Sequence, residues 1–368
     1  MNVLHFYKTY YPDSFGGVEH VIFHLTELNH IKDVECQILS LSRDPTKPYV
    51  SGNNVNVVKA KELVSIASTP FSYDVIYKFK KLAQKADIIH YHFPFPFMDM
   101  IHFLTDIDKP TVVTYHSDII KQKNLLKVYT PLMNRFLKSV SAIVATSPNY
   151  FNTSKTLQKF ASKVKVIPIG IDANAYTFDD ASRVEYWKQK LPAKFLLFVG
   201  ALRYYKGLDI LLDALKQSAA TVVIVGAGPS EQRLKEKART LGLDNIMFLG
   251  GVSEKDKCII LSLCYGVVFP SHLRTEAFGV SLLEGALFSK PIISCEIGTG
   301  TTYINIDRET GLVAKPNDPQ SLCEVMDELW QDEEQAREFG INAKKRFENL
   351  FTAKHMNEEY YRLYRSLL

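Results

Sequence analysis

The sequence predicts an α/β protein built of two doubly wound, Rossmann-like domains that face a cleft. Three observations lead to this fold class. Short apolar runs alternate with amphipathic segments along the whole chain, a pattern typical of parallel sheets that helices cover on both faces. The chain has 368 residues, enough for two domains with cores of their own. The alternation also begins twice, at Val3 and at Leu197, so each half is expected to form a separate sheet.

The elements follow in order from the apolar runs. In the first half, strands are predicted at residues 2–7, 35–40, 55–58, 88–92, 111–115, 142–145 and 165–167, and helices at 18–28, 73–85 and 125–138. In the second half, strands are predicted at residues 195–199, 221–225, 246–248, 266–269, 291–294 and 311–313. The pattern lapses over residues 171–192, which separates an N-terminal domain at 1–174 from a C-terminal domain at 190–350. The last segment, 351–368, is expected to be a helix that packs back on the N-terminal domain.

Composition excludes several classes of protein. Apolar residues make up 46% and charged residues 23% of the chain, which are ordinary shares for a folded globular protein. The five cysteines are scattered without a C-x-x-C pair, which argues against a disulfide framework and a zinc ribbon and fits a reducing cytosol. No basic region followed by an apolar run opens the sequence, and the longest charge-free apolar stretch, residues 258–273, contains Gly266 and Pro270. We therefore expect a cytoplasmic protein with neither a signal peptide nor a membrane span.

Positive charge is concentrated in the first half of the chain. The net charge of +4 divides into +6 over residues 1–175 and −2 over residues 176–368. Residues 119–138 carry five cations and no acid: Lys121, Lys123, Lys127, Arg135 and Lys138. Such a stretch is either a solvated helix face or a surface for an anionic partner. No nucleic-acid recognition motif accompanies it, so we expect no nucleic-acid partner.

Two acids follow the fourth strand of the second half. Ligands of open α/β sheets bind beyond the carboxyl ends of the strands, and Glu276 and Glu284 stand there in EAFGVSLLE. Between them, Phe278, Gly279 and Val280 are expected to offer backbone N–H groups to an anion or a sugar oxygen at the start of a helix. The alternative is a helix cap and a surface acid. Because Glu284 lies within an apolar run, an idle surface position is the poorer explanation for it.

Two cations and three glycines follow other strands. Arg203 and Lys206 lie in GALRYYKG, directly after the first strand of the second half, where positive charge suits the diphosphate of a leaving nucleotide. Gly16 and Gly17 follow the first strand of the chain, and Gly226 begins a G-x-G-P turn after another strand. Glycines at such places serve tight turns as well as phosphate binding, so each alone is a weak signal. The full G-x-G-x-x-G fingerprint is absent here, which counts against a dehydrogenase.

Three histidines lie on or after strands of the first half. His116 comes directly after a predicted strand, at the carboxyl end where a ligand would bind. His90 and His92 alternate along another strand, and we expect them to face opposite sides and to form no zinc pair. The D-x-D of Asp106 and Asp108 precedes a strand, at the wrong end of the sheet for the metal-binding use of that motif. We therefore predict no required metal.

These motifs, in this order along the whole chain, resemble those of the retaining glycosyltransferases of family 4, whose two-domain architecture is called the B fold. The resemblance implies that Glu284 binds the ribose hydroxyls of a nucleotide-sugar donor and that Glu276 contacts the donor sugar. It also implies that the backbone amides of residues 278–280 hold sugar hydroxyls and phosphate. The pair Gly16 and Gly17 corresponds to the phosphate-facing loop of the family.

The resemblance also assigns roles to the cations and to one histidine. Lys206 matches a family position that stabilises the departing diphosphate. Arg203 is expected to share this role, because the family usually has its arginine where this chain has Ala201. Gly226 matches the turn of the family, with a nucleotide contact as its second role. His116 corresponds to a histidine that contacts the donor sugar near the reacting carbon.

The segment EIGTGTTYIN, with the opening HFYKTYYPDSFGGVE and GALRYYKG, is similar to a narrower set of bacterial transferases. These use GDP-mannose or GDP-rhamnose to build lipopolysaccharide O-chains. The similarity implies a mannosyltransferase that acts, without a metal or other cofactor, on a polyprenyl-diphosphate-linked saccharide at the cytoplasmic face of the inner membrane. The basic stretches 119–138 and 73–85 then face anionic lipid. The alternatives are a family-4 transferase that uses a UDP-sugar, a sugar-nucleotide epimerase of the same fold and a non-catalytic lectin-like protein.

Overall fold

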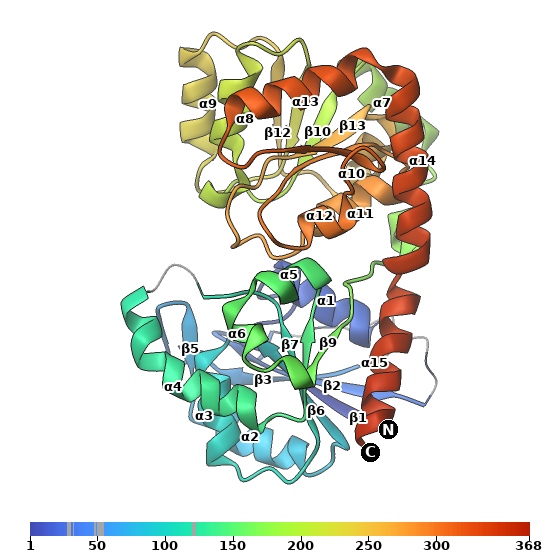
Figure 1. Ribbon diagram of the computed structural model, residues 1–368. Helices are drawn as coiled ribbons and strands as arrows, with labels where there is room; N and C mark the ends of the chain where they lie inside the picture. Colours follow the sequence, from blue (N-terminus) through green and yellow to red (C-terminus); the bar gives the residue numbers. More distant parts are fainter. Residues whose placement is uncertain (28–30, 32, 48, 50–54, 120–122) are drawn as a thin grey trace. The chain divides into compact units, whose positions relative to one another are not determined.

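The computed structural model describes residues 1–27, 31, 33–47, 49, 55–119 and 123–368, which form two compact units. Unit 1 consists of Met1–Gly170 and Ala353–Leu368, and unit 2 of Ile171–Thr352 (Figure 1). We expected the C-terminal domain to begin at residue 190, but residues 171–189 belong to unit 2.

The segment where the apolar pattern lapses is structured. Ala173–Tyr176 forms a short 3-10 helix, η2, and Ala181–Lys190 forms helix α7. Trp187 is the only buried residue of α7, so this helix has no apolar repeat from which the sequence could predict it.

Unit 1 is built on a parallel sheet with the strand order β3-β2-β1-β6-β7-β8-β9. Its strands are β1 Asn2–Phe6, β2 Glu35–Ser42, β3 Asn56–Lys61, β6 Ile88–Phe93, β7 Thr111–Tyr115, β8 Ala142–Ala145 and β9 Val164–Val166. An antiparallel hairpin, β4 Val64–Ile66 and β5 Thr69–Phe71, stands outside this sheet. The helices are α1 Gly17–Thr26, α2 Asp74–Ala83, α3 Pro96–Leu104, α4 Lys123–Ser139, α5 Pro148–Thr153, α6 Lys155–Gln158, η1 Ala161–Lys163 and α15 Ala353–Leu367.

The two faces of the unit 1 sheet differ in chemistry, because successive residues of a strand point to opposite faces. On β6, the ring of Tyr91 lies 6.2 Å from that of Phe79 on α2 and 5.3 Å from that of Phe136 on α4, between ring centroids. The neighbouring His90 faces α15, where its Nδ1 lies 2.6 Å from the hydroxyl of Tyr364. One face is therefore aromatic and apolar, whereas the other buries histidines.

Unit 2 is also built on a parallel sheet, with the strand order β12-β11-β10-β13-β14-β15. Its strands are β10 Leu196–Val199, β11 Val222–Val225, β12 Ile246–Gly250, β13 Gly266–Phe269, β14 Ile292–Cys295 and β15 Gly311–Ala314. After α7, the helices are η3 Tyr204–Lys206, α8 Leu208–Leu215, α9 Glu231–Thr240, α10 Glu254–Leu263, α11 Val280–Leu287, α12 Thr301–Ile304, α13 Pro319–Gln331 and α14 Glu333–Leu350. Among the residues described in the two units, no helix is both long and apolar enough to cross a bilayer.

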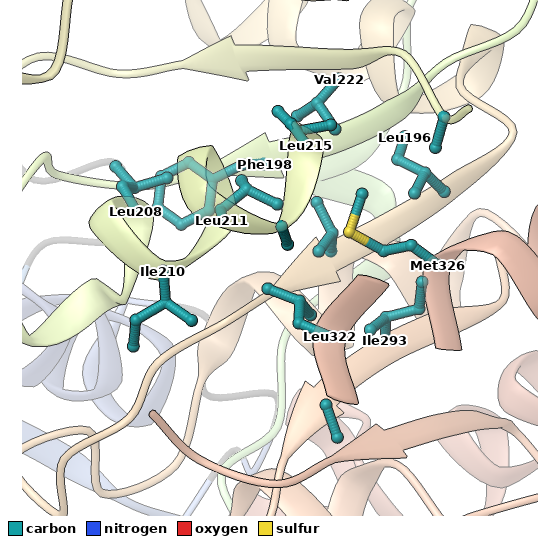
Figure 2. Packing of buried hydrophobic residues seen from close by; sticks show 14 of the residues in the cluster. Leu196, Phe198, Leu208, Ile210, Leu211, Leu215, Val222, Ile293, Leu322 and Met326 are labelled. Atoms are coloured by element: carbon teal, nitrogen blue, oxygen red, sulfur yellow. The ribbon is translucent and has the colours of Figure 1, made fainter. Parts of the chain in front are cut away.

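Unit 2 has an apolar core on each face of its sheet. Figure 2 shows the first core, in which Leu196 and Phe198 of β10 pack with residues of α8 and α13 such as Leu322. Leu197 of the same strand belongs to the second core, together with Trp187 of α7. Alternate residues of one strand therefore stabilise two helix layers, and each such side chain contributes about 1.5–3 kcal/mol when it is buried.

The strand order of unit 2 reverses between β10 and β13. Such a reversal is the topological switch point of an α/β sheet, where the loops after the two strands leave in opposite directions and ligands bind. The loop after β10 contains Lys206, and the loop after β13 contains Glu276. The fold thus brings two residues that are distant in the sequence to the same edge of the sheet.

Candidate functional site in the C-terminal unit and its counterpart in unit 1

Lys206 and Glu276 form an ion pair at the switch point of unit 2. The Lys206 Nζ lies 2.5 Å from Oε2 of Glu276, and each side chain is only 12% exposed. The ammonium also lies 4.6 Å from the centroid of the Phe269 ring at the end of β13. A sheltered pair is screened by salt much less than an exposed one. The site therefore holds one positive and one negative charge at a defined point.

Helix α11 begins close to this pair in the sequence. Its N-cap is Gly279, whose φ of 95° lies in the left-handed region that glycine adopts without strain. Phe278 anchors the turn, since its side chain is 4% exposed and its ring lies 6.2 Å from that of Phe351. Within the described chain, no acceptor pairs with the backbone N–H of Phe278, Gly279 or Val280. The N–H groups of this turn are therefore available to an anion, and their predicted role in binding one stays a prediction.

Glu284 is buried within α11 and held by two residues that the sequence did not single out. Its Oε1 accepts a hydrogen bond from the Tyr176 hydroxyl at 3.0 Å and another from Lys257 Nζ at 2.8 Å. Burial, and then the Glu284 carboxylate, raise the pKa of Tyr176 well above its usual range, so Tyr176 is a stable donor. Burial lowers the pKa of Lys257, but the carboxylates of Glu284 and Glu254 outweigh burial and raise it. Lys257 is therefore charged at neutral pH.

The structure gives Gly226 a clear packing role, whereas it shows no acidic partner for the side chain of Arg203 in the described part of the chain. Arg203 is exposed, and its guanidinium pairs with no acid in the described part of the chain; its backbone oxygen accepts the N–H of Lys206 at 3.0 Å. Gly226 has a φ of 138°, and a Cβ at this position would lie 2.0 Å from the carbonyl oxygen of Gly200. Gly226 is thus a turn residue that lets the loops after β10 and β11 pack together.

The glycine pair of unit 1 lies beside a buried acid. Gly16 is the N-cap of α1, and Gly17 is the first residue of this helix. A Cβ on Gly16 would lie 2.4 Å from Oε2 of Glu19, whereas one on Gly17 would meet nothing within 4 Å. Glu19 is 5% exposed, and its Oε1 accepts a hydrogen bond from the Thr9 hydroxyl at 2.5 Å. We did not expect a carboxylate here, because it places negative charge next to a loop predicted to face phosphate.

His116 lies at the carboxyl end of β7, in a row of three buried imidazoles. Its Nε2 lies 3.0 Å from Nδ1 of His92, and the Nε2 of His92 lies 3.1 Å from Nδ1 of His5. Burial lowers the pKa of His116 and of His5 to about 3 and that of His92 well below its usual range. All three imidazoles are therefore neutral at neutral pH.

The expectation that His90 and His92 face opposite sides of their strand is wrong. Residues two apart on a strand share a face, and the rings of His90 and His92 stack with centroids 4.4 Å apart. With His5, which is in register with His90 on β1, they bring ring nitrogens within 4.8 Å of one another, a spacing that a metal ion would permit. In the structure His5 and His92 hydrogen-bond to each other, and His90 to the hydroxyls of Tyr364 and Thr114. Asp106 and Asp108 are exposed on the loop between α3 and β7.

The residues that sequence analysis missed carried weak local signals. Tyr176 lies in the segment where the apolar pattern lapses, and Lys257 lies in SEKDK, which resembles an exposed helix start. The register of β1 against β6 brings His5 next to His90, and nothing in either strand alone encodes this register. The polar face of β6 could have been found, since a period of two separates its histidines from Tyr91.

Comparison with known proteins gives matches over both halves of the chain. The model of Glycosyltransferase Family 4 matches residues 15–175, and that of glycosyl transferases group 1 matches residues 184–346. The chain is 51% identical to O-antigen chain mannosyltransferase C of Escherichia coli, over 100% of this chain and 99% of that protein. It is 53% identical to D-rhamnosyltransferase WbpZ of Pseudomonas aeruginosa, over 96% of this chain and 93% of that protein.

A solved structure supports the same fold. Anabaena Alr3699/HepE, determined in complex with UDP, has a TM-score of 0.80 over 100% of both chains at 22% identity. At this identity the likeness concerns the fold alone. The two parallel-sheet units, the switch-point site and the family matches in both halves lead to one conclusion. This chain is a glycosyltransferase of the B fold and belongs to glycosyltransferase family 4.

Proposed function

We propose that the protein moves a hexose, mannose in the first instance, from a GDP-sugar to a polyprenyl-diphosphate-linked saccharide, with retention at the anomeric carbon. The observation that carries the proposal is the sheltered ion pair of Lys206 and Glu276 at the switch point of unit 2. The relatives named as an O-antigen mannosyltransferase and a D-rhamnosyltransferase support a role in O-antigen synthesis.

In this proposal, unit 2 binds the donor. Glu284 takes the ribose hydroxyls, and the atom we assign to them is Oε2, because the contacts from Tyr176 and Lys257 both go to Oε1. The backbone N–H groups of Phe278, Gly279 and Val280 take phosphate and sugar oxygens. Lys257 and Tyr176 hold the acid in place, so that little ordering remains to be done when the nucleotide arrives.

The chemical step is supported by charge. As the bond between the anomeric carbon and the phosphate oxygen breaks, Lys206 and Arg203 stabilise the negative charge on the departing diphosphate, work that a metal performs in other transferases. The acceptor hydroxyl attacks the same face and passes its proton to the departing phosphate oxygen, which retains the configuration. Glu276 holds Lys206 in position and contacts the sugar, and His116 contacts the sugar near the reacting carbon.

Unit 1 supplies the acceptor side and the membrane surface. Helix α2 exposes Lys80 and Lys81, and α4 exposes Lys127, Arg135 and Lys138. Part of the predicted basic stretch, residues 120–122, lies outside the described residues. Each exposed cation close to anionic lipid contributes about 1 kcal/mol to binding. We therefore place these two helices against the cytoplasmic face of the inner membrane.

Apolar side chains are exposed on the same two helices. On α4, Leu125 is 54% and Val128 81% exposed, and at the start of α2, Tyr73 and Tyr77 are 83% and 70% exposed. Exposed apolar groups among cations are typical of segments that lie in a lipid interface. Together they favour a lipid surface over a solvated helix face as the reason for the charge.

Calorimetric titration of the full chain with GDP, UDP and ADP, with and without EDTA, tests the donor. We expect GDP alone to bind, with an affinity that EDTA leaves unchanged and that Glu284→Ala abolishes. Glu333→Ala, at a 74% exposed side chain, is the matched control and is expected to bind normally. Tight binding of UDP instead would overturn the mannose assignment, and binding of no nucleotide would favour a non-catalytic protein.

Incubation with GDP-mannose and a polyprenyl-diphosphate-linked saccharide tests the transfer. We expect a longer lipid-linked product whose new linkage has the anomeric configuration of the donor, as determined by NMR of the released saccharide. A product of inverted configuration, or conversion of the donor without an acceptor, would exclude the proposed reaction.

Cosedimentation with vesicles tests the membrane surface. Vesicles that contain phosphatidylglycerol are expected to bind the protein, and vesicles of phosphatidylcholine alone are not. Binding should weaken in salt and after Arg135→Glu combined with Lys138→Glu. Equal binding to both kinds of vesicle would contradict the electrostatic part of the proposal.

A further inference from the structure

The three imidazoles of unit 1 form a chain with a defined order of atoms. Nε2 of His116 meets Nδ1 of His92, and Nε2 of His92 meets Nδ1 of His5, at 3.0 and 3.1 Å. The rings are close to parallel, with 19° between His116 and His92 and 23° between His92 and His5. His116 is 6% exposed, against 0% and 1% for the other two. The row of imidazoles therefore joins His116, at the carboxyl edge of the sheet, to two fully buried histidines.

Neutral imidazoles restrict how protons can be placed in such a chain. Each neutral ring carries one N–H and one nitrogen that accepts. Each contact in the row needs one of each, so the choice at one ring dictates the choice at the next. Either all three rings carry the proton on Nε2, or all three carry it on Nδ1. In the first arrangement Nδ1 of His116 accepts a hydrogen bond, and in the second it donates one.

We infer that His92 and His5 are positioning residues that fix the tautomer of His116, and with it the kind of hydrogen bond that its Nδ1 offers at the carboxyl edge of the sheet. The inference rests on the proposed contact between His116 and the donor sugar. A sugar hydroxyl can both donate and accept, so the tautomer of His116 decides which way that hydroxyl is oriented. The reacting centre thereby depends on a side chain two rings away.

The inner end of the chain is well placed to select the arrangement. His5 lines a cavity of about 10 Å³ beneath α15, together with Cys36, Tyr360 and Tyr364. This volume is about what one water molecule requires. The hydroxyls of Tyr360 and Tyr364 are already bonded to Thr114 and His90, so the polar groups around His5 are themselves ordered. A donor or an acceptor presented to Nε2 of His5 is transmitted to His116.

His90 offers a control for burial, because it stacks on the rings of His5 and His92 while its own hydrogen bonds go to the hydroxyls of Tyr364 and Thr114. It is fully buried on the same sheet face and in register with His5. Its two nitrogens lie 2.6 Å from the Tyr364 hydroxyl and 2.7 Å from the Thr114 hydroxyl, outside the row. His90→Leu therefore removes an equally buried imidazole without breaking the chain.

The test is ¹⁵N NMR of the full chain with labelled histidine, in which long-range ¹H–¹⁵N correlations report the protonated nitrogen of each ring. In the wild type we expect His5, His92 and His116 to carry the proton on the same nitrogen, either Nε2 in all three or Nδ1 in all three. In His5→Leu we expect His116 to become a mixture of tautomers. His5→Asn keeps a hydrogen-bonding group near the former Nδ1 and is expected to preserve the wild-type tautomer. His90→Leu is expected to leave it unchanged.

Kinetics with the sugar donor provide the second readout. His5→Leu is expected to lower kcat about tenfold with KM for the donor within about twofold, since misplacing a catalytic tautomer affects the step more than binding. His5→Asn should recover most of this loss, and His90→Leu should leave kcat within about twofold.

Three results would overturn the inference. The first is a wild-type protein whose three rings carry protons on different nitrogens. The second is a tautomer of His116 that does not respond to His5→Leu, and the third is stoichiometric zinc in the purified protein bound by His5, His90 and His92. If no donor is turned over at all, the proposed function fails while the tautomer measurement still stands. If transfer occurs but His116 ignores residue 5, the inference alone fails.

Discussion

Nine of the ten histidines lie in unit 1, and one, His272, lies in unit 2. Both units are parallel sheets between helices, but they bury polarity differently. Unit 1 has a sheltered ion pair, Lys59 with Asp13, but it also buries a row of neutral rings such as His92, which hydrogen-bond to one another. Unit 2 buries or shelters ionised pairs, among them Lys206 with Glu276 and Lys257 with Glu284.

This difference in buried polar groups is consistent with the different ligands proposed for the two units. A charge that is buried without a partner is far more costly than a neutral polar group with a hydrogen bond. On the proposed function, unit 2 meets a diphosphate and needs cations in place, and it holds Lys206 and Lys257 by pairing them with acids. On the same proposal, unit 1 contacts sugar and lipid, for which neutral imidazoles supply directional hydrogen bonds at lower cost. One fold plan thus supports two electrostatic designs.

The largest effect is expected from removing the cation of unit 2. Lys206→Ala should lower kcat about 10²–10³-fold, because one preorganised charge at the leaving group is lost. Lys235→Ala, which removes a lysine paired with Glu231 on the surface of α9, is the control and should leave kcat unchanged. Circular dichroism must show both variants folded. Normal turnover in Lys206→Ala would show that the ion pair of unit 2 does not stabilise the leaving group.

Acid is expected to destabilise unit 1 more than unit 2. Burial lowers the pKa of His5 and His116 to about 3, against about 6.5 in the unfolded chain. Their stabilisation is therefore full above pH 6.5 and is lost as the pH falls toward 3, because only the unfolded chain takes up the protons. At pH 5.5 these two residues alone reduce the stability of unit 1 by about 3 kcal/mol.

Other groups modify this acid effect in known directions. His24 and His102 have pKa values lowered by burial, to about 2 and about 4, and add to the loss. Burial raises the pKa of Asp99, so this one carboxyl opposes it. In unit 2, the hydrogen bond from Arg183 first of all holds the pKa of Asp256 well below its usual range, so its contribution is lost only below about pH 4. Hydrogen exchange by peptide, at pH 7.5 and 5.5, should show unit 1 opening first, and equal opening of both units would contradict this order.

Replacing one glycine in each unit by alanine compares how strongly the backbone of the two units is constrained. Gly226→Ala should destabilise unit 2 by about 2 kcal/mol or more, since a Cβ would meet the Gly200 carbonyl oxygen at 2.0 Å and φ is 138°. Gly17→Ala is the matched variant in unit 1, where a Cβ meets nothing within 4 Å. We expect it to be neutral within about 0.5 kcal/mol. Denaturant unfolding measures both, and a large loss in Gly17→Ala would show a constraint that the structure does not contain.

The smallest effect is expected at the hydroxyl that orients Glu284. Tyr176→Phe removes one hydrogen bond to the carboxylate, worth about 1 kcal/mol, and should weaken nucleotide binding about fivefold. Tyr186→Phe on α7, where the ring is 43% exposed, should bind the nucleotide normally. Isothermal titration measures both constants. An unchanged affinity in Tyr176→Phe would mean that Lys257 alone holds the acid.

The strands could be predicted from the sequence because each is a short apolar run with polar edges. β7, β8 and β13 have the predicted bounds, Thr111–Tyr115, Ala142–Ala145 and Gly266–Phe269. The hairpin of β4 and β5 was missed, since all of β4 is exposed and shows no alternation. Helix α7 was missed for the same reason, because burial of one side chain leaves no period to detect.

The candidate site could be predicted only as separate motifs. Glu276 and Lys206 were each expected at a strand end, but their contact depends on the reversal of strand order between β10 and β13. Tyr176 reaches Glu284 across 108 positions of the sequence, and no local pattern encodes such a partner. Local propensity therefore predicts elements, whereas topology decides which side chains meet.

Helix α15 gives unit 1 a dependence on the order of synthesis. Its Tyr364 hydrogen-bonds to His90, and its Asn357 donates to the carbonyl oxygen of His24 on α1 at 3.2 Å, so this face of the first sheet lacks part of its cover until residues 353–367 are translated. The sheet of unit 2 and its helices are contiguous in sequence and have no such delay. The part of the first sheet that α15 covers stays uncovered while unit 2 is translated. Unit 1 is therefore completed after unit 2.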